Sequence, residues 1–178
     1  MKPKKFKQIK EEYGNFYREL MKKGKLPMWS TELGFWNAAI SHEVYEAFKQ
    51  LNLQRFKKFI DLGSGDGIVT LIAALFCEEA HGVEHDNELF EKSIEMMHKL
   101  DINNARFHNK DFFEHAIEDY DVVFVSPDKP MERGLEKKLL AELNGKLIHY
   151  GHHFHPVNLK KDKSFSVNNT LITLYSRK

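Results

Sequence analysis

Hydrophobic residues along the chain form short apolar runs that alternate with segments of helical period. The short runs predict strands at 57–62, 80–86, 105–111, 120–127 and 145–153. The helical spacing predicts helices at 38–53, 66–80, 87–102 and 131–143. Strands that alternate with helices form a parallel sheet with helices on both faces. The pattern therefore predicts a single-domain α/β fold with a doubly wound, mostly parallel sheet.

The C-terminal segment 164–178, "SFSVNNTLITLYSRK", shows a different pattern. Its apolar and polar residues alternate, and the central "NN" is typical of a turn. We expect an antiparallel strand here, near the C-terminal edge of the sheet.

The N-terminal residues 1–25 are basic, with nine Lys or Arg against three Glu, whereas the rest of the chain sums to −5. Apolar residues lie three or four positions apart and predict one helix face: Phe6, Ile9, Tyr13, Phe16 and Leu20. Two interpretations stay open. The helix packs this face on the body of the protein, or its lysines recruit an acidic partner such as RNA. We therefore divide the chain into the basic amphipathic helix, 1–25, and a domain at 26–178.

Composition excludes several classes of protein. The 178 residues are 42% hydrophobic, yet no apolar run approaches the roughly 20 residues of a membrane span, and the first residues lack a secretory signal pattern. The single cysteine, Cys77, lies in an apolar run and is interpreted as a core thiol. We expect a cytoplasmic protein with no membrane segment.

The stretch "FIDLGSGDGIVT", residues 59–70, suggests a ligand-binding turn. Gly63, Gly65 and Gly67 follow a predicted strand, with Asp61 before the turn and Asp66 inside it. A dinucleotide site uses G-x-G-x-x-G to hold a pyrophosphate, which two carboxylates would repel. These carboxylates favour a ligand that carries an ammonium group and no phosphate. S-adenosylmethionine has this chemistry, whereas NAD does not.

This stretch resembles the first motif of class I, Rossmann-like S-adenosylmethionine-dependent methyltransferases, and the resemblance continues over about residues 57–150. It implies that the cofactor is S-adenosylmethionine. The cofactor-binding residues that it implies in this motif are Asp61, Gly63, Ser64, Gly65, Asp66 and Gly67.

Later landmarks of the family follow in the expected order. Glu84 lies seventeen residues after Gly67, and the resemblance implies that its carboxylate holds the ribose hydroxyls. His85 is a further candidate beside the adenosine. After the next strand, the resemblance implies that Asp111 meets the adenine amino group and the backbone N–H of Phe112 meets a ring nitrogen.

The sequence after the fourth strand carries the candidate catalytic residues, Ser126 and Asp128. Ser126 is also a cofactor-binding candidate. Family members that methylate base amino groups have Asp, Asn or Ser, then two prolines and an aromatic residue. Here Asp128 replaces the second proline and Lys129 the aromatic ring, so this means of holding a base is incomplete. Asp128 could orient or deprotonate an amine, or serve only as a turn residue.

The layout is similar to compact archaeal protein-lysine methyltransferases, which implies N-methylation of a protein side chain such as lysine. We favour a protein acceptor over RNA or a small molecule. The alternatives are an RNA methyltransferase that uses the basic arm and a non-catalytic S-adenosylmethionine-binding module. Strand alternation would place His152 opposite His153 and His155, so we expect no metal site. The sequence does not indicate an oligomeric state.

Overall fold

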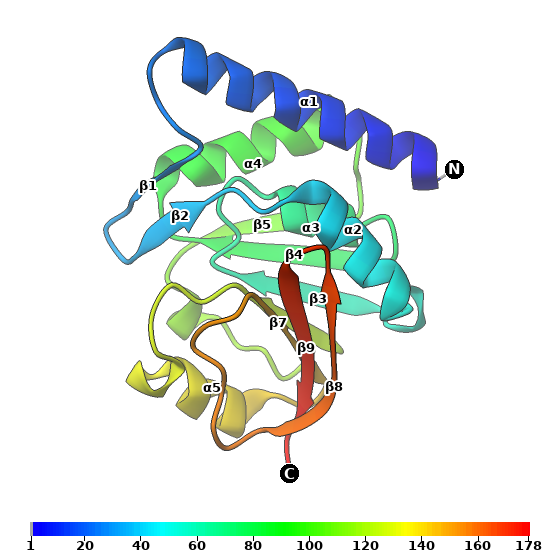
Figure 1. Cartoon of the computed structure of the whole chain (residues 1–178), viewed down its shortest axis with the longest axis vertical. Coiled ribbons are helices and arrows are strands. Elements are labelled where there is room, and N and C mark those ends of the chain that lie inside the picture. Colours follow the sequence, from blue (N-terminus) through cyan, green and yellow to red (C-terminus); the bar gives the residue numbers. More distant parts are fainter. Residues whose placement is uncertain (1) are drawn as a thin grey trace.

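The computed structural model describes residues 2–178, and its centre is a seven-stranded sheet (Figure 1). Its strands are β3 (Lys58–Leu62), β4 (Glu79–Glu84), β5 (Ala105–Asn109), β6 (Val122–Val125), β7 (Lys146–Tyr150), β8 (Lys160–Val167) and β9 (Thr170–Ser176). They follow the spatial order β5-β4-β3-β6-β7-β9-β8. The strands from β3 to β7 pair in parallel, and β9 pairs antiparallel with β7 and β8. The predicted α/β fold and its antiparallel C-terminal edge are confirmed.

Helices cover both faces of this sheet, and a small hairpin lies beside it. The helices are α1 (Lys2–Lys22), α2 (Ser41–Gln50), α3 (Ile68–Ala73), α4 (Asn87–Lys99) and α5 (Leu135–Glu142). Short 3-10 turns are η1 (Leu53–Arg55), η2 (Phe112–Glu114) and η3 (Met131–Arg133). The hairpin pairs β1 (Met28–Ser30) with β2 (Phe35–Asn37). In the part of the chain that the structure describes, no helix is long and apolar enough to cross a membrane.

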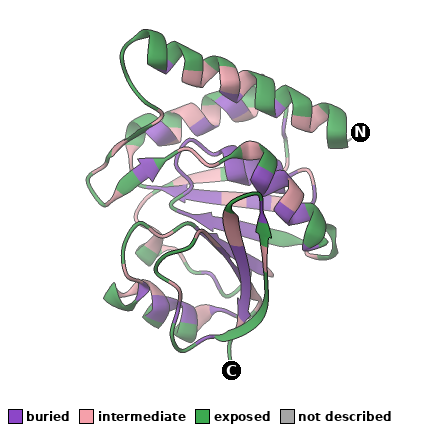
Figure 2. Cartoon of the chain, in the orientation of Figure 1, coloured by how far each residue is buried: buried purple, intermediate pink, exposed green. Residues whose placement is uncertain are grey.

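Alternation along the central strands builds two apolar layers. Phe59 of β3 and Phe124 of β6 belong to one layer, while Ile60 and Val123 belong to the other. Successive strand side chains point to opposite faces, so each strand contributes to both layers. The first layer is covered by α1 to α4 and the second by α5. Figure 2 shows these strands as the buried centre of the molecule.

The basic helix α1 packs its apolar face on the body. Ile9 and Tyr13 are buried, and Phe6 stacks on Tyr45 of α2 with ring centroids 3.9 Å apart. Lys5 donates a hydrogen bond to the carbonyl of Leu100, directly after α4. The N-terminal end of α1 therefore lies near the C-terminal end of α4. Met1 lies outside the described residues.

Two of the differences from the sequence predictions concern element boundaries, and a third is a missed hairpin. The predicted helix 66–80 is helical only over α3, because Glu79 and Ala80 pair with β3 as the first residues of β4. The predicted strand 145–153 ends at Tyr150, where Gly151 takes a φ of 114°. The hairpin β1–β2 was not predicted. Its strands of three residues are too short for a hydrophobic period to be recognised.

Candidate cofactor and acceptor site

Four parallel strands end at one edge of the sheet, and the candidate site residues follow these ends. β3 leads into Gly63, β4 ends at Glu84, β5 precedes Asp111, and β6 precedes Ser126. Strand order reverses between β3 and β6, since β4 and β5 lie on one side of β3 and β7 lies beyond β6. Such a switch point is where open α/β sheets bind ligands.

The glycine turn after β3 depends on backbone conformations that other residues rarely adopt. The φ angles are 79° at Gly63, 55° at Gly65 and 85° at Gly67. At Gly65 there is also no room for a side chain, because a Cβ atom there would lie 2.4 Å from the ring of Trp36. The turn and the hairpin residue Trp36 are therefore in close contact.

Three buried carboxyl groups surround this turn. Asp61, Asp66 and Glu84 are 3%, 1% and 9% exposed, and burial raises the pKa of each, to about 6 for Asp66. The charge of Glu84 also raises the pKa of Asp61 and of Asp66. Among residues 2–178, no Lys or Arg forms an ion pair with any of the three. A cationic ligand would relieve the cost of holding these charges in the interior.

Glu84 is held by the backbone and keeps free acceptor capacity. Its Oε2 accepts a hydrogen bond of 2.7 Å from Gly65 N, and its Oε1 accepts one of 2.8 Å from Asp86 N. A carboxylate has about four lone-pair sites, so each oxygen can accept one more hydrogen bond. Two hydroxyl groups on neighbouring carbons, as in a ribose, match this capacity.

Asp66 points toward α1. Its Oδ2 accepts a hydrogen bond of 2.6 Å from the hydroxyl of Tyr17, and its Oδ1 accepts one of 3.3 Å from Ile68 N. The hydroxyl of Tyr13 donates to the backbone carbonyl of Asp66 at 2.7 Å. The carboxylate inside the glycine turn therefore contacts the N-terminal helix.

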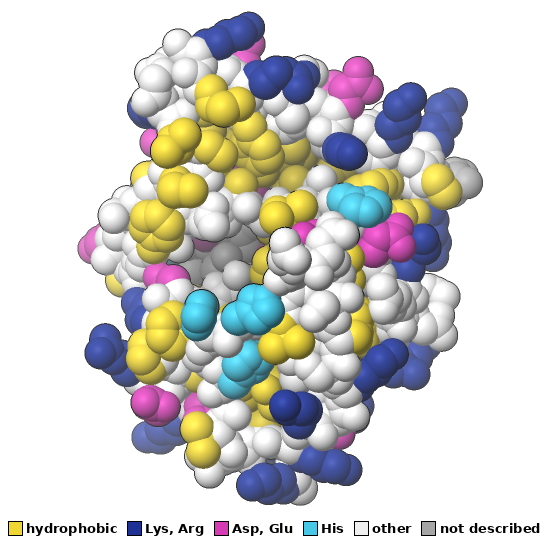
Figure 3. Space-filling model, viewed as in Figure 1, with side chains coloured by type: hydrophobic (Ala, Val, Ile, Leu, Met, Phe, Trp, Pro, Cys, Tyr) yellow, Lys and Arg dark blue, Asp and Glu magenta, His cyan; other side chains and the backbone are white. Residues whose placement is uncertain are grey.

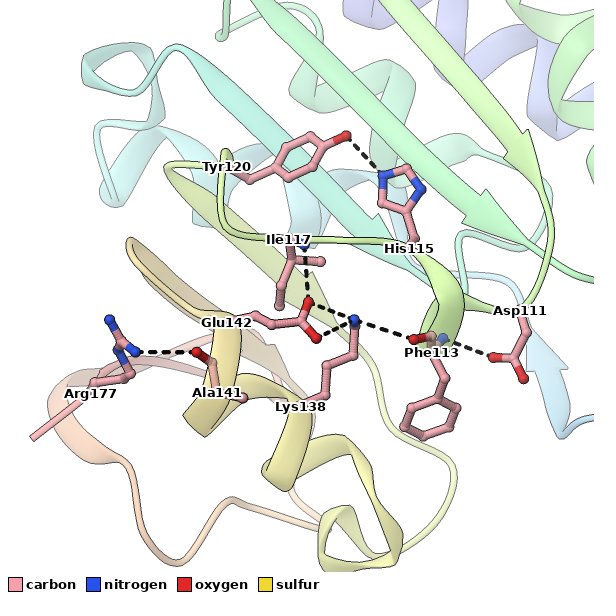
Figure 4. A network of polar contacts seen from close by, with 9 residues as sticks. All are labelled: Asp111, Phe113, His115, Ile117, Tyr120, Lys138, Ala141, Glu142 and Arg177. Carbon is pink, nitrogen blue, oxygen red and sulfur yellow. Dashed lines mark hydrogen bonds and ion pairs between the residues drawn. The ribbon is translucent and has the colours of Figure 1, made fainter.

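A polar network fixes the segment after β5 (Figure 4). Asp111 begins η2, and its Oδ1 accepts a hydrogen bond of 2.9 Å from Phe113 N. From α5, Lys138 pairs with Glu142 at 2.7 Å, and Glu142 accepts a hydrogen bond of 3.2 Å from Ile117 N. The loop that carries Asp111 is thus fastened to α5 on the second face of the sheet.

The loop after β6 holds the hairpin. Asp128 Oδ2 accepts a hydrogen bond of 2.6 Å from Phe35 N, and Lys129 Nζ donates one of 2.5 Å to the Leu33 carbonyl. A third contact joins the hairpin to the end of β4, because Glu32 lies 3.1 Å from the Nε2 atom of His85. Asp128, one of the two candidate catalytic residues, therefore also anchors the hairpin.

A cavity of about 610 Å³ opens between these loops and the hairpin, and Figure 3 shows the hollow on this face of the molecule. Gly63, Glu84 and His85 line it, as do Asp111, Phe112, Ser126 and Asp128. The other predicted cofactor residues do not line it; they are Asp61, Ser64, Gly65, Asp66 and Gly67. They belong to β3 and the turn on which Trp36 lies. Direct contact of these five with the cofactor stays a prediction.

The site fits S-adenosylmethionine. The cavity has the size of a small-molecule site, and the buried carboxyl groups beside it suit a ligand with an ammonium and a sulfonium charge. The hydroxyl oxygen of Ser64 is buried and has no hydrogen-bond partner among the described residues. Glu84, Asp111 and the glycine turn would hold the nucleoside and amino-acid ends of the ligand.

Several residues at the cavity were not predicted from the sequence. Phe35 and Trp36 come from the hairpin, and Tyr150 and Thr170 come from β7 and β9. The signal for the hairpin is in "MWSTELGFWN", where aromatic residues flank a Thr-Glu-Leu-Gly turn. Tyr150 and Thr170 both donate to buried Glu43, more than 100 residues earlier in the chain, and no local pattern indicates this contact.

The histidines after β7 are arranged differently from the prediction. Residues 151–155 are not a strand, so the alternation argument does not apply to them. His152 contacts the Asn169 carbonyl at 2.6 Å, while the ring of His155 stacks on His149 with centroids 4.1 Å apart. Within residues 2–178, no group of three or more His, Cys, Asp or Glu is placed to hold a metal ion.

Solved structures with this fold include proteins bound to S-adenosylmethionine or S-adenosyl-L-homocysteine, among them two methyltransferases. An RNA methyltransferase from Salinibacter ruber, in complex with S-adenosyl-L-homocysteine, is 19% identical, with a TM-score of 0.69 over 78% of this chain and 92% of that chain. The tRNA (uracil-54, C5)-methyltransferase of Pyrococcus abyssi, also with S-adenosyl-L-homocysteine, is 15% identical, with a TM-score of 0.66 over 85% and 45%. A variant of MtNAS in complex with S-adenosylmethionine is 15% identical, with a TM-score of 0.64 over 78% and 63%. At this level of identity, these likenesses show the fold.

The sequence also shows to which family the chain belongs. A search of curated proteins finds no significant sequence match. Residues 28–143 match the model of the protein-L-isoaspartate(D-aspartate) O-methyltransferase (PCMT) family. This match confirms the prediction of an enzyme with S-adenosylmethionine as its cofactor. Because the match spans more than half of the chain, the protein belongs to the PCMT family and is an S-adenosylmethionine-dependent methyltransferase.

Proposed function

We propose that this methyltransferase transfers the methyl group to the side-chain amine of a protein, and that lysine is the acceptor. The observation that carries the proposal is the distribution of charge along the cavity. Lys110 and Arg133 lie at the end formed by Asp111 and Phe113. We define the acceptor end as the part of the cavity that Asp128, Tyr150 and Thr170 line, and its charge balance is negative. This second end is the place for the acceptor.

Two carboxylates give the acceptor end its negative charge. Asp128 lines the cavity, and Glu43 lies directly behind Tyr150 and Thr170, whose hydroxyl groups both donate to it. One cation, Lys129, also lies here, and its ammonium is directed to the Leu33 carbonyl. An incoming lysine ammonium is attracted to this end, whereas an anionic group is repelled.

The walls of the acceptor end suit the stem of a lysine side chain. Phe35, Trp36 and Tyr150 supply aromatic surface, and Leu33 and Ile40 supply aliphatic surface. A chain of four methylene groups packs on such surface, and aromatic rings stabilise ammonium and methylammonium groups. Leu33, Phe35 and Ile40 are also exposed, and a protein substrate could cover their apolar surface.

The residues of the chain have a positioning role in the transfer. S-adenosylmethionine supplies a methyl group that is already activated by its sulfonium. Asp128 uses Oδ2 to hold Phe35 N, and among residues 2–178 its Oδ1 has no hydrogen-bond partner. This free oxygen can accept a hydrogen bond from the amine and orient its lone pair, which methyl transfer requires. The hairpin forms one wall of the cavity and would shield the reacting groups from water on that side.

A carboxylate oxygen is the second candidate acceptor, because the PCMT family is described as acting on L-isoaspartate and D-aspartate of proteins. Such a carboxylate would face Asp128 and Glu43 at the acceptor end. Repulsion between these like charges disfavours binding of a carboxylate acceptor. The charge distribution therefore favours an amine over a carboxylate.

RNA is the third candidate, since structures of similar fold include RNA methyltransferases. Its support within the chain is the basic helix α1, and Lys5 of that helix is bonded to the Leu100 carbonyl. α1 has 21 residues and is about 30 Å long, so its first lysines lie far from the hairpin, which follows its other end. RNA bound at these first lysines would not present a base to the cavity.

The deciding experiment uses S-adenosylmethionine with a labelled methyl group. The protein is incubated with a lysine-rich protein, an isoaspartyl peptide and tRNA, and each product is then treated with alkali. Methyl esters release volatile methanol in alkali, whereas N-methyl lysine is stable. We expect alkali-stable label in the protein acceptor and methyl-lysine after hydrolysis. Label released as methanol, or label in tRNA, would contradict the proposal.

A further inference from the structure

The N-terminal helix α1 makes direct polar contact with the glycine turn of the cofactor site. Tyr13 and Tyr17 lie one turn apart on α1, and both hydroxyl groups donate to Asp66. Tyr13 reaches the backbone carbonyl at 2.7 Å and Tyr17 reaches the carboxylate at 2.6 Å. Tyr13 is almost completely buried and Tyr17 is half-buried. These contacts join residues that lie 53 and 49 positions apart in the sequence.

Asp66 is connected to the rest of the turn on both sides. The residue before it, Gly65, donates its N–H to Glu84, the residue proposed to hold the ribose. The residue two positions after it, Ile68, begins α3 and donates to Asp66 Oδ1. A movement of Asp66 therefore moves both the Gly65–Glu84 contact and the start of α3.

We propose that Tyr13 and Tyr17 are positioning residues for S-adenosylmethionine, and that α1 holds the glycine turn in its binding conformation through Asp66. Docking of α1 and binding of the cofactor are then thermodynamically coupled. Such coupling is reciprocal, so the bound cofactor also holds α1 more firmly on the body. The inference concerns cofactor binding alone and is independent of the nature of the acceptor.

Asp66 also gives the coupling a dependence on pH. Its pKa is raised to about 6 by burial, while the hydrogen bonds from Tyr17 and Ile68 N act to lower it. The carboxylates that face this cluster are Glu84 on β4, Asp61 on β3 and Glu95 on α4, and Glu95 is paired with Lys92 of the same helix. Loss of the Tyr17 hydroxyl therefore raises the pKa of Asp66 further. Since protonated Asp66 attracts a cationic cofactor less, affinity should then begin to fall at a higher pH.

The test compares two substitutions that each remove one hydroxyl group. Y17F removes the bond to Asp66. Y45F is the matched control, because Tyr45 also packs against α1 through Phe6 but has no side-chain hydrogen bond within residues 2–178. Dissociation constants for S-adenosylmethionine are measured by calorimetry from pH 5 to pH 8. We expect Y17F to raise the dissociation constant about 5- to 20-fold at pH 7, and Y45F to change it less than 2-fold.

Two further measurements separate positioning from a loss of packing. In Y17F the fall in affinity at acid pH should begin at a higher pH, whereas a packing defect would weaken binding equally at every pH. In the parent protein, S-adenosylmethionine should slow amide hydrogen exchange along α1, and Y17F should reduce this protection. If Y17F unfolds, D66N is used, which retains an acceptor for Tyr17 and should flatten the pH profile. Equal affinities of Y17F and Y45F, or an unchanged pH profile in D66N, would overturn the inference.

Discussion

Asp128 shows how one carboxylate can act on two parts of the same site. One oxygen fixes the hairpin through Phe35 N, and in the proposed function the other faces the acceptor amine. The substitutions D128N and D128A separate these roles, because Asn retains a carbonyl oxygen for Phe35 N but carries no charge. We expect D128N to lower turnover with an amine acceptor 10- to 100-fold and to leave the cofactor dissociation constant unchanged.

D128A should lower turnover as well and should also loosen the hairpin. Both tryptophans of the chain, Trp29 and Trp36, lie in the hairpin, so tryptophan fluorescence reports on its position. We expect a changed emission spectrum in D128A and a parent-like spectrum in D128N. Full turnover in D128N would show that the charge of Asp128 has no part in the reaction.

A second prediction concerns the contact between the glycine turn and Trp36. Gly63 and Gly65 both have positive φ, but only at Gly65 would a Cβ atom collide with the ring of Trp36. G63A should cost about 1 to 2 kcal/mol for the left-handed backbone alone. G65A adds the collision, so we expect a larger loss of unfolding free energy and a displaced hairpin. Urea unfolding and tryptophan fluorescence of the two variants provide the measurement. Equal losses of unfolding free energy would show that the Trp36 side chain moves aside without cost.

Single residues of the site could be predicted where a local rule applies. Glu84 and Asp111 stand directly at or after strand ends, and both line the cavity as expected. The orientation of Asp66 could not be predicted, because it depends on Tyr17, which comes from an element 49 residues earlier. The same holds for Glu43, whose partners lie on β7 and β9. Sequence patterns indicate the strand end at which a side chain lies, whereas its direction depends on tertiary contacts.

At the scale of elements, α1 distinguishes a docking helix from a nucleic-acid arm. If its lysines bound RNA through phosphate contacts, affinity would fall steeply with salt, and removing those charges would flatten the slope. We expect the triple substitution of Lys4, Lys5 and Lys7 by Gln to leave RNA binding weak and its salt slope unchanged. The matched control replaces Lys160, Lys161 and Lys163 of β8. Gel shifts at two salt concentrations measure the salt dependence of RNA binding in both variants. A slope that flattens only in the α1 variant would support an RNA acceptor.

The elements themselves were predicted in proportion to their length and burial. β6 has four fully buried residues in an apolar run, and α4 has a regular helical period, so both were recognised. The hairpin was missed because strands of three residues contain no measurable period. α3 was predicted too long because "LIAALFC" is buried except for the half-buried Leu75, and hydrophobicity alone does not show where a buried helix ends. The missed element forms one wall of the cavity.

At the scale of the whole molecule, the two faces of the sheet differ in their polar content. The face under α1 to α4 carries the carboxyl groups of the cofactor site, whereas the other face contains buried or half-buried histidines. His81 contacts His108 at 3.0 Å, and His149 stacks on His155. Burial lowers the pKa of all four, so each is neutral in the folded protein at pH 7. Acid should therefore weaken this second face.

His149 provides the sharpest test of this expectation. It is completely buried, neither ring nitrogen has a hydrogen-bond partner among the described residues, and burial lowers its pKa from 6.5 to about 4. The unfolded chain takes up a proton near pH 6.5 while the folded chain resists it, so stability present above pH 6.5 is lost as the pH falls toward 4. This difference amounts to about 2 kcal/mol between pH 7 and pH 5.

Asp66 works in the opposite direction. Its folded pKa is raised above the unfolded value, so its burial costs least at low pH and most above pH 6.

H149F removes only the histidine contribution, and we expect its unfolding free energy to fall about 2 kcal/mol less than that of the parent between pH 7 and pH 5. The control is H98Q, at an exposed histidine of α4, which should follow the parent. Urea unfolding at the two pH values gives the comparison. If H149F lost as much stability in acid as the parent, another group would govern acid stability. Protonation of the buried His149 imidazole in the parent would then cost no free energy of unfolding.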